Sequence, residues 1–333
     1  MIGAAQNDVA ISITGLGCKV PDRVVTNDDL KQYVDTTDEW IRERTGIRER
    51  RMASNEEALS DIALPACRDA LAQAGLEGKD IDLLIVATVT PDMSFPSTGA
   101  ILADQLGAVD AAAYDLSAGC TGFMYALAQA YGMLAGGLAK RALVVGGDLL
   151  SRILDWDDRS TLVLFGDGAG AVVIEAVPER GFLGFELGAD GGGGQSLWLP
   201  GSGSRIFDES ERFVKMNGRE VFKFATRILV QSAQDIMRQC GVTIDDVDVY
   251  VPHQANMRII DHATKKLGVP SEKVVINVDR FGNTSSGSIP LALADAAQDG
   301  RLKPGKLVLM TGMGAGLTWG SALIRWTKEM GPT

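Results

Sequence analysis

Apolar residues along the chain follow two alternating patterns. Runs that are apolar at nearly every position are typical of strands buried on both faces, and they alternate with segments in which apolar residues recur at helical spacing. The runs predict strands at 10–17, 81–88, 141–147, 171–175, 247–251, 274–278, 307–311 and 318–326. The helical spacing predicts helices at 28–33, 54–75, 97–106, 222–241 and 256–267. Strands and helices that alternate in this way predict an α/β fold with helices on both faces of its sheets.

The segment from 120 to 139 contains no charged residue. A helix that is apolar on every face belongs in the interior of a protein or in a membrane. Thr121, Gln129 and several glycines favour the interior. Cys120 stands where this helix should begin, and the positive end of a helix dipole would favour its thiolate and make it a nucleophile. The alternative is a small buried cysteine that only fills space in the core.

The two halves of the chain repeat each other. The segment 67–86 aligns with the segment 233–252 at a constant offset of 166, with aspartates and glycines matching. Matches at a single offset indicate a duplicated unit. We therefore expect two related halves, residues 1–180 with Cys120 and residues 181–333, with the uncharged helix near their interface.

Composition narrows the class of protein. The 333 residues are 46% hydrophobic and 23% charged, which is ordinary for a soluble globular protein, and the net charge of −11 disfavours nonspecific binding to nucleic acid. Four cysteines without a CxxC pair and only two histidines argue for reduced thiols and against a structural zinc site. Residues 1–10 lack the pattern of a signal peptide. We expect a cytoplasmic protein with no membrane span and no metal.

Polar residues follow the predicted strands at different places in the two halves. His253 comes just after the strand 247–251, and Asn283 lies in a tight loop at 281–287. Because ligands bind at strand ends in α/β folds, these two side chains and Cys120 could converge on one cavity. Alternatively, His253 is a satisfied polar residue at a strand end and Asn283 is a turn residue.

Two further features suggest ligand contacts. Alternating glycines recur at 166–170 and 312–316, without the spacing of a dinucleotide-binding loop, and those at 312–316 could bring backbone N–H groups close to an oxyanion. The arginine-rich segment 38–51 surrounds Trp40, and it is either a solvated helix face or a site for phosphates and a flat ring. His262 lies within a predicted helix, and we expect it at the surface.

The sequence resembles the β-ketoacyl-acyl carrier protein synthase III family of the thiolase superfamily over essentially its whole length. The motifs that carry the resemblance are DEWIRERTGIRER (38–50), FPSTGA (95–100), DLSAGCTGFMYAL (115–127), FGDGAGAVVI (165–174), VPHQANMRII (251–260), FGNTSSGSIP (281–290) and MGAGLTWGSALIRW (313–326). The resemblance implies a thiolase-like, internally duplicated fold with five αβαβα layers.

The resemblance also implies a two-step reaction that initiates type II fatty-acid synthesis. Cys120 would take an acyl group from acyl-CoA, with acetyl-CoA as the leading candidate, and hold it as a thioester. His253 and Asn283 would bind the thioester carbonyl of malonyl-acyl carrier protein and stabilise the enolate formed when carbon dioxide leaves. Backbone N–H groups of Cys120 and Ala315 match the family's other oxyanion hole. No cofactor is implied.

Further residues match binding positions of the family. The positions that hold coenzyme A match Trp40, Arg44, Thr45, Arg159 and Asn256. The loop residue that closes the partner's acyl pocket in a homodimer matches Phe95, and the entrance and wall of the active site match Phe222 and Met313. The basic patch that docks the acidic carrier protein matches Lys223, Arg258, Lys265 and Lys266.

Two positions depart from the family pattern. Met313 stands where many members have phenylalanine, and Ala315 where many have glycine, so we expect a reshaped pocket and leave the primer open. One alternative function is a relative in secondary metabolism that passes the acyl group from Cys120 to another acceptor. A second alternative is an acyl-CoA-binding protein on the same fold that performs no catalysis.

Overall fold

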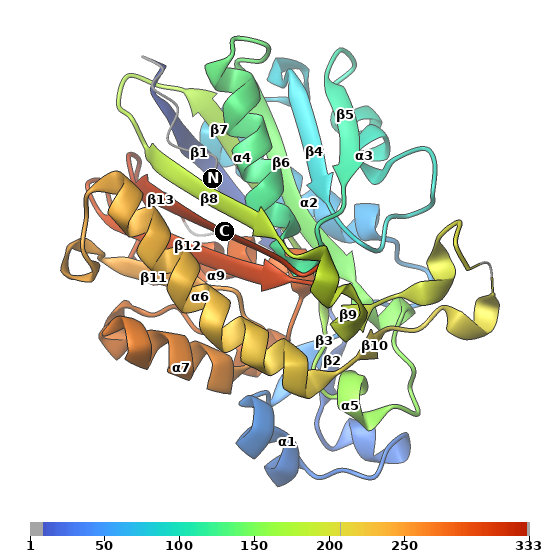
Figure 1. The fold of residues 1–333 in the computed structure, drawn as a ribbon. Coiled ribbons are helices and arrows are strands. Elements are labelled where there is room, and N and C mark those ends of the chain that lie inside the picture. Colours follow the sequence, from blue (N-terminus) through green and yellow to red (C-terminus); the bar gives the residue numbers. More distant parts are fainter. Residues whose placement is uncertain (1–8, 207, 332–333) are drawn as a thin grey trace.

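The computed structural model describes residues 9–206 and 208–331. Two β-sheets alternate with three layers of helices, giving five layers in the order αβαβα (Figure 1). The helices of the outer layer on the first sheet are α2 (Leu59–Ala74) and α3 (Thr98–Leu106). The central layer contains α4 (Gly122–Ala135) and α9 (Ser288–Gln298), and the outer layer on the second sheet contains α6 (Gly218–Cys240) with α7 (Met257–Leu267) beside it. The expected thiolase-like fold is confirmed.

The two sheets share one strand order. The first sheet runs β1 (Ile11–Lys19), β7 (Asp167–Ala176), β6 (Arg141–Leu149), β4 (Leu83–Ala87) and β5 (Ala112–Leu116). The second runs β8 (Phe182–Ala189), β13 (Thr318–Arg325), β12 (Leu307–Gly314) and β11 (Val249–Pro252). In each sheet the third and fourth strands pair in parallel, and the second strand is antiparallel to both of its neighbours. This common order confirms the duplication that the repeat predicts.

The matched aspartates and glycines have the same structural roles in both halves. Gly75 ends α2 and Gly241 ends α6, each with a positive φ (74° and 67°) that glycine adopts without steric cost. Asp82 accepts the backbone N–H of Arg141 at the start of β6, and Asp248 accepts that of Leu307 at the start of β12. The repeat in the sequence therefore corresponds to equivalent helix ends and strand starts in the two halves.

The predicted strand at 274–278 is wrong. It is the counterpart of β5, but only one bridge remains, between Tyr250 and Val274, and the chain then enters the short helix α8 (Val278–Phe281). The side chain of Gln254 donates to the carbonyl of Val275 and accepts the backbone N–H of Asn277. These contacts satisfy backbone groups that a longer strand would have paired with a neighbour.

The smaller elements lie together at one end of the molecule (Figure 1). They are α1 (Asp38–Thr45), α5 (Arg159–Leu162), the strand pair β2 (Val24–Thr26) and β3 (Glu49–Arg51), and the strand pair β9 (Leu197–Trp198) and β10 (Lys215–Met216). Three predicted helices have different bounds: the first is only a 3-10 turn at Asp29–Gln32, α2 begins at Leu59, and α6 begins at Gly218. The segment before Leu59 is held instead by contacts of Ser54 with Glu57 and Arg152.

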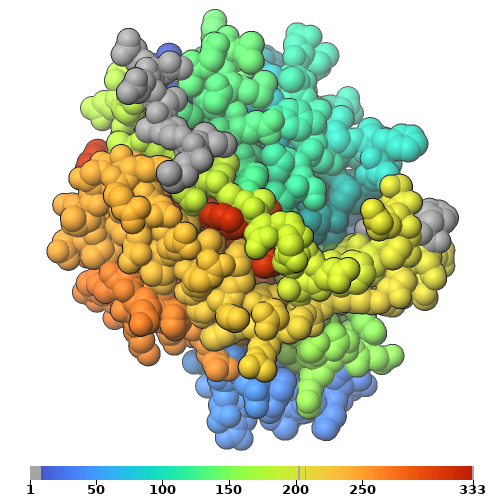
Figure 2. Space-filling model, viewed as in Figure 1, coloured from blue at the N-terminus to red at the C-terminus, as the bar shows by residue number. Residues whose placement is uncertain are grey.

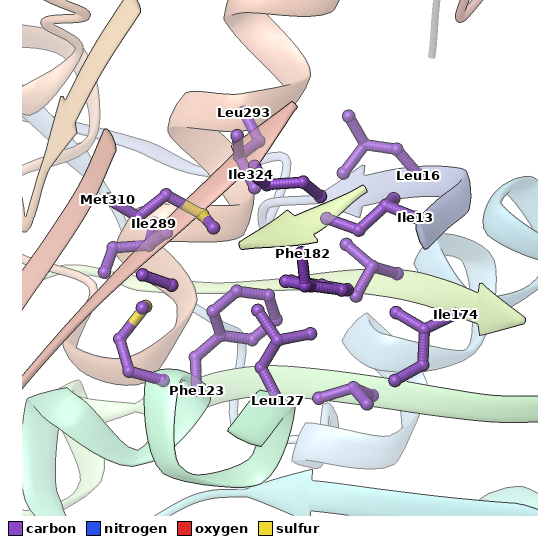
Figure 3. Close-up of a cluster of buried hydrophobic side chains, with 14 of the residues drawn as sticks. Ile13, Leu16, Phe123, Leu127, Ile174, Phe182, Ile289, Leu293, Met310 and Ile324 are labelled. Carbon is purple, nitrogen blue, oxygen red and sulfur yellow. The ribbon is translucent and has the colours of Figure 1, made fainter. Parts of the chain in front are cut away.

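The central helices explain the uncharged sequence after Cys120. Phe123 and Leu127 of α4 pack with Ile289 and Leu293 of α9 between the sheets, and none of the four is more than 1% exposed (Figure 3). A helix in this position contacts apolar side chains on all faces, so a charge would be buried without a partner. Among residues 9–206 and 208–331, no helix combines the length and the apolar surface that a bilayer crossing requires.

Candidate active site

Cys120 lies in a tight turn between β5 and α4. The turn is the 3-10 segment Gly119–Thr121, and the Cys120 side chain is buried. A Cβ atom on Gly119 would come 2.8 Å from the backbone nitrogen of Ala315, and one on Gly314 would come 2.6 Å from that of Cys120. The two glycines therefore allow the end of β12 to lie directly against the turn, with Cys120 and Ala315 lining the same cavity.

The expected lowering of the Cys120 pKa is wrong for the unliganded protein. Burial is the main cause that raises the pKa of the thiol to about 11; a hydrogen bond with the side chain of Ser285 opposes this rise, and the nearby carboxylate of Asp148 adds to it. Loss of water around the sulfur therefore outweighs its position at the start of α4. The side chain of Cys120 is therefore a neutral thiol at neutral pH in the unliganded protein.

His253 follows β11 and is completely buried. Its backbone N–H donates to the carbonyl of Thr311 at 2.7 Å, and its ring Nδ1 lies 2.5 Å from Oγ of Ser288. The other ring nitrogen, Nε2, has no hydrogen-bond partner among the described residues. Burial lowers the pKa of His253 to about 4, so the imidazole is neutral at pH 7.

Asn283 is fixed by the tight loop that precedes α9. Its backbone N–H donates to the carbonyl of Leu164 at 2.9 Å, and its own carbonyl accepts the N–H of Gly166 at 3.0 Å. The side-chain Oδ1 accepts the backbone N–H of Ser285 at 2.9 Å. This contact assigns the two ends of the amide, so the Nδ2 group is the end that can donate to a ligand.

Two chambers meet at Cys120. The smaller, of about 160 Å³, brings Cys120, His253 and Asn283 together. Its wall also includes Phe222, Asn256 and Met313. The larger, of about 340 Å³, is mainly apolar, and its lining includes Val89, Leu150, Ile153, Leu154, Leu199 and Val214. On the face shown in Figure 2, part of the red C-terminal segment is visible between the yellow-green residues after β8 and the orange-yellow residues of α6.

The candidate coenzyme A residues lie on α1, at the start of α5 and just before α7. Two guanidinium groups lie over the ring of Trp40: the Cζ atom of Arg44 is 5.0 Å from the ring centroid, and that of Arg159 is 4.7 Å from it. Nδ2 of Asn256 donates to the carbonyl of Arg44 at 3.2 Å, which ties the start of α7 to α1. Thr45 differs from the rest because its side chain is buried and its hydroxyl donates to the carbonyl of Ile41. Thr45 supports the end of α1 and does not present its hydroxyl to a ligand.

The residues matched to protein partners are all on the surface. Phe95 is 85% exposed and lies outside both chambers of its own chain. The four matched basic residues are exposed on the neighbouring helices α6 and α7 (Figure 1), and the guanidinium of Arg258 lies 5.4 Å from the ring of Phe222. His262 is exposed on α7, as expected.

Several residues of the site were not predicted. Leu197 and Phe165 line both chambers, Ser285 lines the larger one beside Cys120, and Ser288 contacts His253. Leu197 lies in a surface strand pair whose sequence gives no signal of a cavity. For the serines, the run of small polar residues after Asn283 is the only signal, and it is equally typical of a turn.

Comparisons with known proteins give the same family for both halves of the chain. Family models described as "3-Oxoacyl-[acyl-carrier-protein (ACP)] synthase III" and its C-terminal part match residues 114–191 and 237–326. The β-ketoacyl-[acyl-carrier-protein] synthase III of Symbiobacterium thermophilum is 53% identical over 96% of this chain and 98% of the relative. The crystal structure of the Thermus thermophilus β-ketoacyl-[acyl carrier protein] synthase III has a TM-score of 0.90 and 48% identity, covering 95% of this chain and 99% of that one.

A solved priming β-ketosynthase from the R1128 polyketide pathway is also similar, with a TM-score of 0.91 and 36% identity over 99% of this chain and 98% of that one. Chains this similar over nearly their whole length share both a fold and an ancestor. Together with the duplicated five-layer fold and the cavity that contains Cys120, His253 and Asn283, these matches show that the chain belongs to the β-ketoacyl-acyl carrier protein synthase III family.

Proposed function

We propose that this chain condenses an acyl-CoA primer with malonyl-acyl carrier protein, giving 3-ketoacyl-acyl carrier protein, coenzyme A and carbon dioxide. The observation that carries the proposal is the cavity in which a cysteine meets two neutral hydrogen-bond donors, His253 and Asn283. The direct test incubates the purified protein with both substrates and measures the 3-ketoacyl product and carbon dioxide. An ester or amide product without carbon dioxide would favour transfer to another acceptor instead.

The first step is acyl transfer to Cys120. Its sulfur forms a bond to the acyl carbonyl carbon while the bond to the sulfur of coenzyme A breaks, and the proton of the thiol leaves with coenzyme A. The carbonyl oxygen becomes negatively charged in the transition state, and backbone N–H groups of Cys120 and Ala315 are the proposed donors to it. The end of β12 lies close enough to the Cys120 turn to supply the second of these groups.

The second step is decarboxylation and condensation. Nε2 of His253 and Nδ2 of Asn283 would donate to the thioester carbonyl of the malonyl group, whose oxygen becomes an enolate oxygen as carbon dioxide leaves. The carbanion then attacks the acyl carbonyl, and the sulfur of Cys120 is the leaving group. Because Cys120, His253 and Asn283 are all buried, two fixed donors stabilise this charge more strongly than they would in solution.

The proposed coenzyme A site and the proposed homodimer rest on side chains at the surface. We propose that the ring of Trp40 and the guanidinium groups of Arg44 and Arg159 bind the flat base and the phosphates of coenzyme A. An aromatic side chain as exposed as that of Phe95 supports a homodimer in which it enters the partner. We also propose residues 1–180 and 181–333 as the two halves, and a cytoplasmic location.

We propose acetyl-CoA as a primer, and the larger chamber predicts that branched four- and five-carbon primers are accepted as well. Val214 lines this chamber and is half-buried. Val214→Phe should therefore reduce kcat/KM for branched primers about 10- to 100-fold while acetyl-CoA changes less than threefold, because the added ring fills space that only longer chains use. Intact-protein mass spectrometry of acylation with a panel of acyl-CoAs measures this. Val24→Phe, at an exposed position of β2, is the control, and an equal loss for all primers would contradict the prediction.

The basic patch of α6 and α7 predicts a selective defect toward the carrier protein. Replacing Lys223 and Arg258 together with glutamate should raise KM for malonyl-acyl carrier protein about tenfold or more and flatten its dependence on salt. Acylation by acyl-CoA should change less than threefold. Lys303→Glu makes the same kind of change at an exposed position before β12 and should have no effect. A defect that appears equally with Lys303→Glu would show only a response to net charge.

A further inference from the structure

The side chain of Ser288 forms a hydrogen bond with the imidazole of His253. Oγ of Ser288, the first residue of α9, lies 2.5 Å from Nδ1 of His253 and is buried. The backbone N–H of Gln254 also donates to this Oγ, at 3.4 Å. The contact therefore connects the strand end that carries His253 to the central helix that follows the Asn283 loop.

The direction of this hydrogen bond decides what the other ring nitrogen can do. A serine hydroxyl has one hydrogen to donate and can accept others. Because the N–H of Gln254 already points at Oγ, the hydroxyl hydrogen is free to point at Nδ1. A neutral imidazole whose Nδ1 accepts a hydrogen bond carries its single hydrogen on Nε2.

Nε2 is the nitrogen that faces the cavity. It is buried and has no hydrogen-bond partner among the described residues, and His253 lines the chamber that also contains Cys120 and Asn283. The opposite tautomer would place an unprotonated nitrogen there, which could accept a hydrogen bond but could not donate one to an oxyanion. The burial that lowers the pKa of His253 to about 4 keeps the ring neutral, so the choice of tautomer determines its function.

We propose that Ser288 is a positioning residue that donates to Nδ1 of His253 and thereby keeps the hydrogen on Nε2, where it is available to the substrate. The identity of that substrate oxygen, the malonyl thioester carbonyl, rests on the proposed function. The tautomer itself is a property of the unliganded protein, so it is tested without any substrate.

The first experiment is NMR of protein labelled with ¹⁵N in its histidine rings. The chain has only two histidines, and exposed His262 serves as the internal reference, with His262→Gln to assign the signals. At pH 7 the His253 signals should show a protonated Nε2 and an unprotonated Nδ1, and Ser288→Ala should shift the Nδ1 signal. A protonated Nδ1 in the wild type, or an Nδ1 signal that Ser288→Ala leaves in place, would overturn the proposal.

The second experiment separates the two half-reactions. Ser288→Ala should slow condensation with malonyl-acyl carrier protein about tenfold, as expected for one lost hydrogen bond, and leave acylation of Cys120 within twofold. Ser288→Thr, which keeps the hydroxyl, should recover most of the rate. Ser232→Ala removes a buried hydroxyl on α6, bonded to Glu186 and Ser321, and is the matched control. Full condensation by Ser288→Ala, or equal loss in both half-reactions, would contradict the role.

These outcomes test the role of Ser288 separately from the proposed function. If the wild type fails to condense any primer with malonyl-acyl carrier protein, the proposed function fails, and the ring nitrogens still show which tautomer the protein holds. If the wild type condenses normally but Nδ1 of His253 is protonated, the function stands and the role of Ser288 does not.

Discussion

Replacing Cys120 with alanine is expected to abolish acyl transfer from acyl-CoA and to reduce condensation by at least about 10³-fold. In the proposed reaction the sulfur holds the acyl group between the two steps, and among residues 9–206 and 208–331 no other cysteine lines either chamber. Cys67, for comparison, is fully buried in another part of the core, where burial raises its pKa to about 12. Intact-protein mass after incubation with acyl-CoAs should show a thioester adduct in the wild type and none in Cys120→Ala.

The control for this experiment is Cys67→Ala, which removes a buried thiol outside the chambers and should leave the adduct intact. Thermal unfolding of both variants checks that the fold is retained. An adduct that persists in Cys120→Ala would place the nucleophile elsewhere. A protein that binds acyl-CoA without forming an adduct, and equally well in Cys120→Ala, would instead match the non-catalytic acyl-CoA-binding alternative.

The fold could be predicted because local signals repeat in the two halves. Gly75 and Gly241 end equivalent helices, and Asp82 and Asp248 hold equivalent strands, so each half carries the same marks in its sequence. The strand predicted at 274–278 failed for the opposite reason. Its apolar residues suit a strand, but the side chain of Gln254, distant in sequence, takes the backbone groups that would have paired.

The catalytic candidates could be predicted as a set, but their electrostatic states could not. Strand ends in a duplicated α/β fold converge, and this alone suggested that Cys120, His253 and Asn283 share a cavity. Whether a thiol there is acidic depends on how much water surrounds it, which the sequence of the turn does not record. The contact between Ser288 and His253 likewise exists only because α9 packs beneath the end of β11.

Asn283→Asp is expected to leave acylation of Cys120 within about threefold of wild type and to slow condensation by at least about 10²-fold. The substitution conserves shape, and the retained Oδ1 can still accept the N–H of Ser285, so the loop should keep its conformation. The other end of the side chain changes from a donor to a carboxylate oxygen. That oxygen would face the enolate, and the two negative charges would repel each other in a site that excludes water.

The measurement is the mass of the enzyme during the reaction. With malonyl-acyl carrier protein present, the acyl form of Asn283→Asp should persist, whereas the wild type should discharge it and release carbon dioxide. Asn55→Asp makes the same chemical change in an exposed loop, next to Arg152, and should behave like the wild type. Rapid discharge by Asn283→Asp would remove Asn283 from the condensation step. His253 would then be the only one of the two proposed side-chain donors left to bind the thioester oxygen. The second hydrogen bond to that oxygen would have to come from a group other than Asn283.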